Sequence, residues 1–239
     1  LGAVGLSRET VTALQEMKDR GLLLNKVTYG AVVNACAYGK DMAAARRVME
    51  EMRSSGVMPD AVEYSNLLHG YKRLNATEEC LACFDEMLFY GVKPSTRTYD
   101  GVLGALAAAE RWQVFRMYLD RMQKEGVRLS AITYGWAVRG AERAQDWGEV
   151  LSLFRALQAD HYHPTASTCH AALKASLALN DLDTAVAAMT TLLREGWTMG
   201  RTVYATLQLR LLVGGDLGTL RKLMLEAEKE MPSTAAAAP

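Results

Sequence analysis

Residues 26–60, KVTYGAVVNACAYGKDMAAARRVMEEMRSSGVMPD, decide the fold, because residues 61–95, AVEYSNLLHGYKRLNATEECLACFDEMLFYGVKPS, repeat their pattern. Both stretches have a tyrosine near the start, a methionine late in the segment, a glycine four residues after that methionine, and a proline just before the end. A pattern that returns at a fixed period of this size indicates stacked structural repeats.

Three series of residues share the period of 35 along the chain. The first contains Tyr29, Tyr64, Tyr99 and Tyr134, continued by Cys169 and Tyr204. The second contains Met17, Met52, Met87 and Met122, continued by Leu157 and Leu192, and the third contains Gly21, Gly56, Gly91, Gly126, His161 and Gly196. Because a 34-residue period would slip out of register along these series, they exclude the related 34-residue repeat.

Each unit reads as two helices, for example about Val27 to Tyr38 and about Met42 to Ser54. The glycine that follows the second helix suits a left-handed C-terminal cap, and a proline shortly afterwards ends the helical pattern. Equivalent positions of the second helix are apolar and are expected to be buried between units; they are Met49, Phe84, Leu119, Phe154, Met189 and Met224.

The pattern therefore predicts an all-α fold, a right-handed superhelical solenoid of helix-turn-helix repeats whose first helices line the concave face. We expect a truncated repeat at 1–25, five repeats, a capping helical pair and a disordered tail. The repeats are 26–60, 61–95, 96–130, 131–165 and a diverged 166–200; the capping pair is 201–232 and the tail 233–239.

With these markers the chain resembles the pentatricopeptide repeat family, in its 35-residue P-type form. The resemblance implies a binding protein rather than an enzyme, working without a cofactor. The implied ligand is single-stranded RNA, read at about one base per repeat. It also implies an address in the mitochondrion or chloroplast. The chain begins at Leu1, so any targeting peptide is expected to precede that residue.

The resemblance further assigns base-reading roles to the residue after the tyrosine series and to the last residue of each unit. These pairs are Gly30 with Asp60, Ser65 with Ser95, Asp100 with Ser130, Gly135 with Thr165, and His170 with Gly200. Only Ser65 with Ser95 matches the residue types that the family prefers, so the reading predicts low sequence selectivity. The positions that would sandwich a base, two before the tyrosine, are Val27, Val62, Arg97 and Ile132.

Charge is distributed unevenly although the chain has no formal net charge. The six expected first helices hold nine basic residues: Lys26, Lys72, Arg73, Arg97, Arg139, Arg143, Lys174, Arg201 and Arg210. They hold three acidic residues: Glu63, Asp100 and Glu142. This excess predicts a basic groove for an anionic strand; the other interpretation is that long basic side chains merely cover apolar helix surface. Our candidates for phosphate contact are Lys26, Lys72, Arg73, Arg139, Arg143, Lys174 and Arg210.

Other chemistry finds little support in the sequence. Cys80 and Cys83 have the spacing of half a zinc or redox site, but the chain has no second cysteine pair. Their equivalents in other units are mostly apolar, so we expect both cysteines to be buried in the core. His161 and His163 suit a surface turn better than a metal site. The tryptophans occupy non-equivalent positions that favour packing, although they could stack bases; they are Trp112, Trp136, Trp147 and Trp197. Four scattered cysteines favour a reducing compartment.

Two functions therefore remain open. The first is an organellar protein that holds a short single-stranded RNA on its concave face, acting in transcript stability, processing or translation. The second is a structural subunit of a large organellar assembly, such as a mitochondrial or chloroplast ribosome, that contacts ribosomal RNA and proteins without reading bases. A peptide-binding adaptor is the least favoured class.

Overall fold

The computed structural model describes residues 2–195 and the isolated positions 205, 208, 212 and 218, with side chains described from Ser7 onward. Several expectations lie outside these residues. They are the capping pair and the tail as units, and the roles of Trp197, Gly200, Arg201, Tyr204, Arg210 and Met224.

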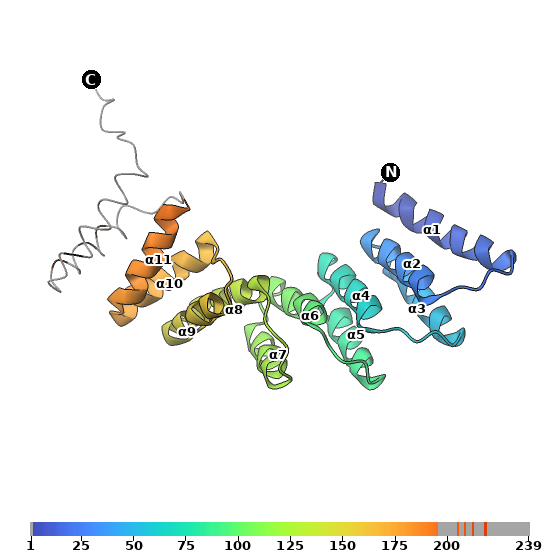
Figure 1. Cartoon of the computed structure of the whole chain (residues 1–239). Helices are drawn as coiled ribbons and strands as arrows, with labels where there is room; N and C mark the ends of the chain where they lie inside the picture. The colour runs from blue at the N-terminus through green and yellow to red at the C-terminus, as the bar shows by residue number, and fades with distance from the viewer. Residues whose placement is uncertain (1, 196–204, 206–207, 209–211, 213–217, 219–239) are drawn as a thin grey trace, which may run out of the picture. The chain divides into compact units, whose positions relative to one another are not determined.

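All regular elements between residues 2 and 195 are α-helices (Figure 1). In chain order they are α1 Gly2–Asp19, α2 Lys26–Tyr38, α3 Met42–Ser54, α4 Ala61–Arg73, α5 Thr77–Phe89, α6 Thr96–Ala108, α7 Trp112–Lys124, α8 Ala131–Arg143, α9 Trp147–Ala159, α10 Ala166–Leu179 and α11 Leu182–Arg194. The chain divides into two compact units, Leu1–Thr133 and Tyr134–Pro239. The expected class, an all-α helical-repeat solenoid, is confirmed.

The helix ends follow the chemistry read from the sequence. The first helices of successive pairs begin after a polar N-cap, as where Asn25 Oδ1 accepts the backbone N–H of Thr28 at 2.9 Å. The second helices end at glycines with positive φ: Gly21, Gly56, Gly91 and Gly126. There the amide of Gly56 donates to the carbonyl of Arg53 and that of Val57 to Met52, which closes the last turn. His161 adopts the same left-handed backbone where the glycine series fails.

The tyrosine series joins the two helices of each pair. The tyrosine rings of the four pairs are buried, at 5% exposure or less. Each hydroxyl reaches the end of the second helix, so that Tyr99 donates to Glu125 at 2.7 Å and Tyr134 donates to Asp160 at 2.8 Å. A buried ring with a polar tip at the rim therefore fixes the distance between the helices of a pair.

In the first unit, neighbouring first helices pack directly on one another, α2 on α4 and α4 on α6. The second helices α3, α5 and α7 make no comparable contact among themselves, so the first-helix side of this unit is the inner, concave side. A charged network bridges α3 and α5 on the other side: Arg46 and Arg53 both bind the Glu86 carboxylate. Arg53 also donates to the Tyr64 hydroxyl at 2.8 Å.

A glycine permits the closest approach of two first helices. A Cβ placed on Gly101 of α6 would lie 2.7 Å from the Leu68 Cβ of α4, and 3.6 Å from the backbone nitrogen of His69. The Cys80 thiol lies at the same crossing, 3.8 Å from the carbonyl of Leu68. Helix α6 therefore rests against the α4 backbone itself, which fixes the position of His69 beside it.

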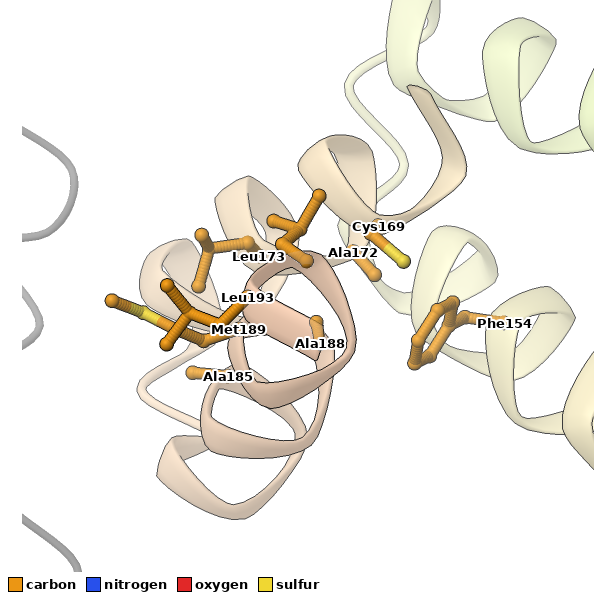
Figure 2. Packing of buried hydrophobic residues seen from close by; sticks show 9 residues of the cluster. Phe154, Cys169, Ala172, Leu173, Ala185, Ala188, Met189 and Leu193 are labelled. Carbon is orange, nitrogen blue, oxygen red and sulfur yellow. The ribbon is translucent and has the colours of Figure 1, made fainter. Parts of the chain in front are cut away.

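In the second unit, the core between α9, α10 and α11 combines large and small side chains (Figure 2). Phe154 from α9 faces Cys169 and Ala172 of α10, while Met189 and Leu193 of α11 cover Leu173. Small residues such as Ala185 and Ala188 allow α11 to lie close to α10. This is the expected burial of one apolar stripe per helix against the next pair.

Replacement of Gly101 with alanine is expected to destabilise the fold. The helical preference of alanine favours the folded state by about 1 kcal/mol, but overpacking against a Cβ that cannot move by rotation costs roughly 1–3 kcal/mol. Denaturant unfolding should therefore show a net loss for Gly101→Ala. Gly135→Ala is the matched control: its Cβ would meet nothing within 4 Å, so it should be neutral or stabilising. Equal stability of the two variants would contradict the close approach at Gly101.

Candidate nucleic-acid interface

The concave side of the first unit carries two adjoining hollows formed by α2, α4 and α6. The larger, here called the Val62 hollow, has a volume of about 470 Å³ and is lined by Lys26, Val27, Gly30, Ala31, Asn34, Val62, Glu63, Asn66 and Arg97. The smaller, here called the His69 pocket, has a volume of about 240 Å³ and is lined by Asn34, Ala37, Tyr38, Asn66, His69, Lys72, Arg73 and Arg97. They share Asn34, Asn66 and Arg97 and form one groove.

Three of the four base-sandwich candidates meet in this groove. Val27 and Val62 line the Val62 hollow, with 79% and 56% of their surface exposed, and Arg97 lies at its junction with the His69 pocket. Ile132 is likewise exposed, at 61%. An exposed β-branched residue at the start of a helix gains nothing from the core, so Val27 and Val62 form an apolar floor of the groove that is available to a ligand.

In the four units whose following helix is described, the last residue caps that helix. Asp60 accepts the backbone N–H of Val62 at 2.7 Å, while Glu63 accepts the N–H of Asp60 in return. Lys26 also binds the Asp60 carboxylate from the preceding first helix. Burial would raise the pKa of Asp60, but the hydrogen bonds from Lys26 and Val62 outweigh it and lower that pKa. The capping role recurs at Ser95, Ser130 and Thr165.

The other predicted base-reading position, directly after the tyrosine, presents few free hydrogen-bonding groups to a base. Gly30 and Gly135 have no side chain, and Ser65 is buried with its hydroxyl donating to the carbonyl of Ala61 at 2.5 Å. Asp100 accepts hydrogen bonds from Ser130, its own predicted partner, at 2.9 Å and from Thr133. The exposed His170 has its Nδ1 2.7 Å from the carbonyl of Ala166. The described polar groups at these positions are used within the protein.

The described basic candidates differ in their surroundings. Lys26 pairs with Asp60, and Lys174 pairs with Glu142 at 3.1 Å while lying over the Trp147 ring. Burial lowers the pKa of the half-buried Lys72, against the opposing effect of the Asp100 carboxylate. Arg73 donates to the carbonyl of Ala37 at 2.7 Å, and its guanidinium lies 4.5 Å from the centroid of the Tyr38 ring. Arg139 and Arg143 are exposed on α8.

Among the polar and aromatic residues that line the His69 pocket, four were not among the sequence candidates: Asn34, Tyr38, Asn66 and His69. Asn34 and Tyr38 are one helical turn apart on α2, and Asn66, His69 and Arg73 follow at turn spacing on α4. Polar residues at this spacing lie on one face of a helix, and on the predicted inner helices they would have indicated a polar wall of the groove. These residues carry no charge at neutral pH and do not recur from unit to unit, so neither the charge count nor the repeat pattern indicated them.

The cysteines serve the core, as expected. Cys80 and Cys83 are fully buried, and burial raises the pKa of each thiol to about 12, so both stay protonated and unreactive. His161 and His163 are exposed in a turn, and the described residues contain no cluster of three side chains suited to a metal ion. Trp112, Trp136 and Trp147 are half-buried. No described helix is both long enough and apolar enough to cross a bilayer.

The family assignment follows from the sequence profile of the pentacotripeptide-repeat region of PRORP, which matches residues 6–134. This chain belongs to the pentatricopeptide repeat family. The comparison with curated proteins gave no match. Solved pentatricopeptide repeat structures resemble it at low identity, a likeness that concerns the fold.

Three of these structures illustrate the likeness. The maize protein PPR10, in complex with an 18-nt psaJ RNA element, aligns with a TM-score of 0.55 and 20% identity over 97% of this chain and 33% of its own. The pentatricopeptide repeat domain of Arabidopsis thaliana protein-only RNase P 1, in complex with tRNA, aligns with a TM-score of 0.58 and 18% sequence identity. The alignment covers 74% of this chain and 94% of that domain. Nuclear proteinaceous RNase P 2 from A. thaliana aligns with a TM-score of 0.56 and 16% sequence identity, over 78% of this chain and 42% of its own. The chain thus spans about a third of the length of PPR10.

The capping role of Asp60 can be separated from its ion pair. Asp60→Ala removes both and should reduce the free energy of unfolding by about 1–2 kcal/mol. Asp60→Asn keeps a capping oxygen and loses only the ion pair with the half-exposed Lys26, so it should cost less than about 1 kcal/mol. Thermal or denaturant unfolding measures both. If alanine and asparagine were tolerated equally well, capping would not be the main structural role of Asp60.

Proposed function

We propose that this pentatricopeptide repeat protein binds single-stranded RNA along the α2–α4–α6 groove, with little selectivity for base sequence. The observation that carries the proposal is the composition of that groove: exposed apolar side chains at Val27 and Val62, beside the cationic side chains of Arg97, Lys72 and Arg73. The apolar floor suits the faces of bases, and the positive rim suits the phosphates of the strand. The RNA ligands in the PPR10 and RNase P 1 structures support the same class of partner.

The low selectivity follows from the state of the predicted base-reading side chains. Discrimination between bases requires donors and acceptors that are free to meet a base edge. The polar groups of Asp60, Ser65 and Asp100 instead cap helices, bond to backbone or bond to neighbouring side chains. Breaking such a bond to read a base exchanges one hydrogen bond for another, so it adds little to affinity.

The biological setting proposed for this activity is an organelle, mitochondrion or chloroplast, where the protein acts by holding a transcript rather than by catalysis. The groove offers surfaces and charges for binding, and the buried Cys80 and Cys83 are kept as neutral thiols. Stability, processing and translation of the bound transcript are the processes such holding would serve.

A second candidate, a structural subunit of an assembly such as an organellar ribosome, is favoured by one observation. The internal hydrogen bond between Ser130 and Asp100 joins both members of a predicted reading pair to each other. A surface of this kind contacts RNA by shape and phosphate without a code. Native purification with and without ribonuclease separates the candidates: co-purification with ribosomal proteins that survives nuclease supports the subunit, whereas nuclease-sensitive enrichment of transcripts supports free RNA binding.

Binding is tested by fluorescence anisotropy with short single-stranded RNAs of different sequence. Val62→Asp should weaken binding by roughly tenfold, because it removes an apolar contact and repels phosphate. Its stability should be unchanged, since Val62 is exposed and an acidic residue suits the first turn of a helix. The logarithm of the affinity should fall with the logarithm of salt concentration with a slope of about −2, as expected for three phosphate contacts to a single strand.

Met117→Asp is the matched control, an exposed apolar residue on the second helix α7 that receives the same charge. It should leave the affinity unchanged. Absence of binding by the unaltered protein, or equal losses in the two variants, would refute binding in the groove. Strong discrimination among RNA sequences would refute the proposed low selectivity.

A further inference from the structure

The His69 pocket has the electrostatic character of an anion site. Lys72 and Arg73 from α4 and Arg97 from α6 bring three cationic side chains to its wall. Asp100 of α6 is the carboxylate that acts on both His69 and Lys72. Three cationic side chains against this one carboxylate leave an excess of positive charge, which favours an anionic ligand.

A buried amide points to the same use. Asn66 is 7% exposed and lines both hollows. Within the part of the chain that the structure describes, its side chain has no hydrogen-bond partner in the protein. The amide borders the groove and supplies two donors that an oxyanion can accept. An oxyanion in the pocket would accept these donors in place of solvent.

The walls of the pocket are held in place by packing. Helix α6 rests on the α4 backbone beside His69, because Gly101 has no Cβ to separate them. On the opposite side, Arg73 is fixed by its hydrogen bond to the carbonyl of Ala37 and by the Tyr38 ring. A site with fixed donors loses little entropy when the ligand binds.

We propose that the His69 pocket binds one phosphate group of the RNA, with the charge supplied by Arg97, Lys72 and Arg73 and a neutral hydrogen bond donated by Asn66. The inference rests on the proposed function and assigns a particular contact within it. The volume of about 240 Å³ is many times the roughly 10–15 Å³ that one water molecule needs by this measure. This leaves room for a phosphate, whether terminal or within the strand, and its ribose.

His69 makes this contact sensitive to pH. Burial, followed by the nearby charges of Lys72 and Arg97, lowers the pKa of His69, while Asp100 opposes the shift. From α2 the pocket receives the neutral Asn34 and Tyr38, and from α5 the Cys80 thiol beside Lys72 stays protonated because burial raises its pKa to about 12. A bound phosphate raises the pKa of His69, so the complex takes up a proton and binding tightens as pH falls.

The contact is tested by anisotropy with a short single-stranded RNA carrying either a 5′-phosphate or a 5′-hydroxyl. Arg97→Gln should weaken binding by roughly tenfold and make the salt dependence less steep. Lys124→Gln is the charge-matched control, removing a positive charge from the end of the second helix α7, and should change neither quantity. A difference between the two RNAs that Arg97→Gln abolishes identifies a terminal phosphate; equal binding of both RNAs, with the Arg97→Gln loss retained, identifies a phosphate within the strand.

The pH dependence is tested from about pH 8 to about pH 5.5, the range in which histidine titrates. Wild-type affinity should rise by about tenfold for a pKa raised by one unit in the complex. His69→Gln should lose most of the rise in affinity between high and low pH, whereas His163→Gln, in an exposed turn, should show the same rise as wild type. Histidine resonances of the unaltered protein should show a higher pKa for His69 with RNA than without it.

The two levels of the proposal fail differently. If the wild-type protein does not bind RNA, the proposed function itself is wrong. If it binds RNA but Arg97→Gln matches Lys124→Gln, and RNA leaves the His69 resonance unchanged, the groove binds RNA without a phosphate in this pocket and the inference is wrong. The resonance measurement needs no substitution, so it decides the matter even where a variant folds poorly.

Discussion

The direct packing of one first helix on the next is the constraint on which the first unit depends. At its tightest point Gly101 brings α6 onto the α4 backbone, where even a methyl group would collide with Leu68. This approach lines up α2, α4 and α6 along one side and leaves the second helices apart. The tyrosine hydroxyls and the Glu86 network then fix the outer helices against the inner ones. The groove is a consequence of this arrangement and needs no separate domain.

The same arrangement gives the predicted base-reading residues a structural role. The end of each unit is also the start of a helix, whose first backbone N–H groups require an acceptor. Asp60 and Ser95 supply it, and a side chain engaged in capping is no longer free to select a base. The other predicted base-reading position, directly after the tyrosine, rarely supplies a free polar group in its place, since it holds glycine at Gly30 and Gly135. Affinity without selectivity is therefore the outcome that this combination of residues favours.

Polar residues that do not repeat give the groove its particular character. Asn66 and His69 lie at positions that are occupied by other residue types in the neighbouring units, where Ala31 and Gly101 are equivalent to Asn66, and Asn34 is equivalent to His69. Burial and the charges of Lys72 and Arg97 lower the pKa of His69, so the charged form of its ring is disfavoured in the free protein. A bound anion would offset the neighbouring positive charges and would accept hydrogen bonds from the Asn66 amide.

The sequence by itself determined the helical pairs, their turns and the buried stripe, because period, caps and glycine positions are local properties that each unit repeats. It also indicated which helices carry excess positive charge. It could not show that Lys26 pairs with Asp60 or that Ser65 turns inward, because these contacts join different helices or depend on burial. The His69 pocket was hidden for the same reason. Its walls come from three helices, and only the packing of α2 on α4 and of α4 on α6 brings Asn34, His69 and Arg97 around one volume.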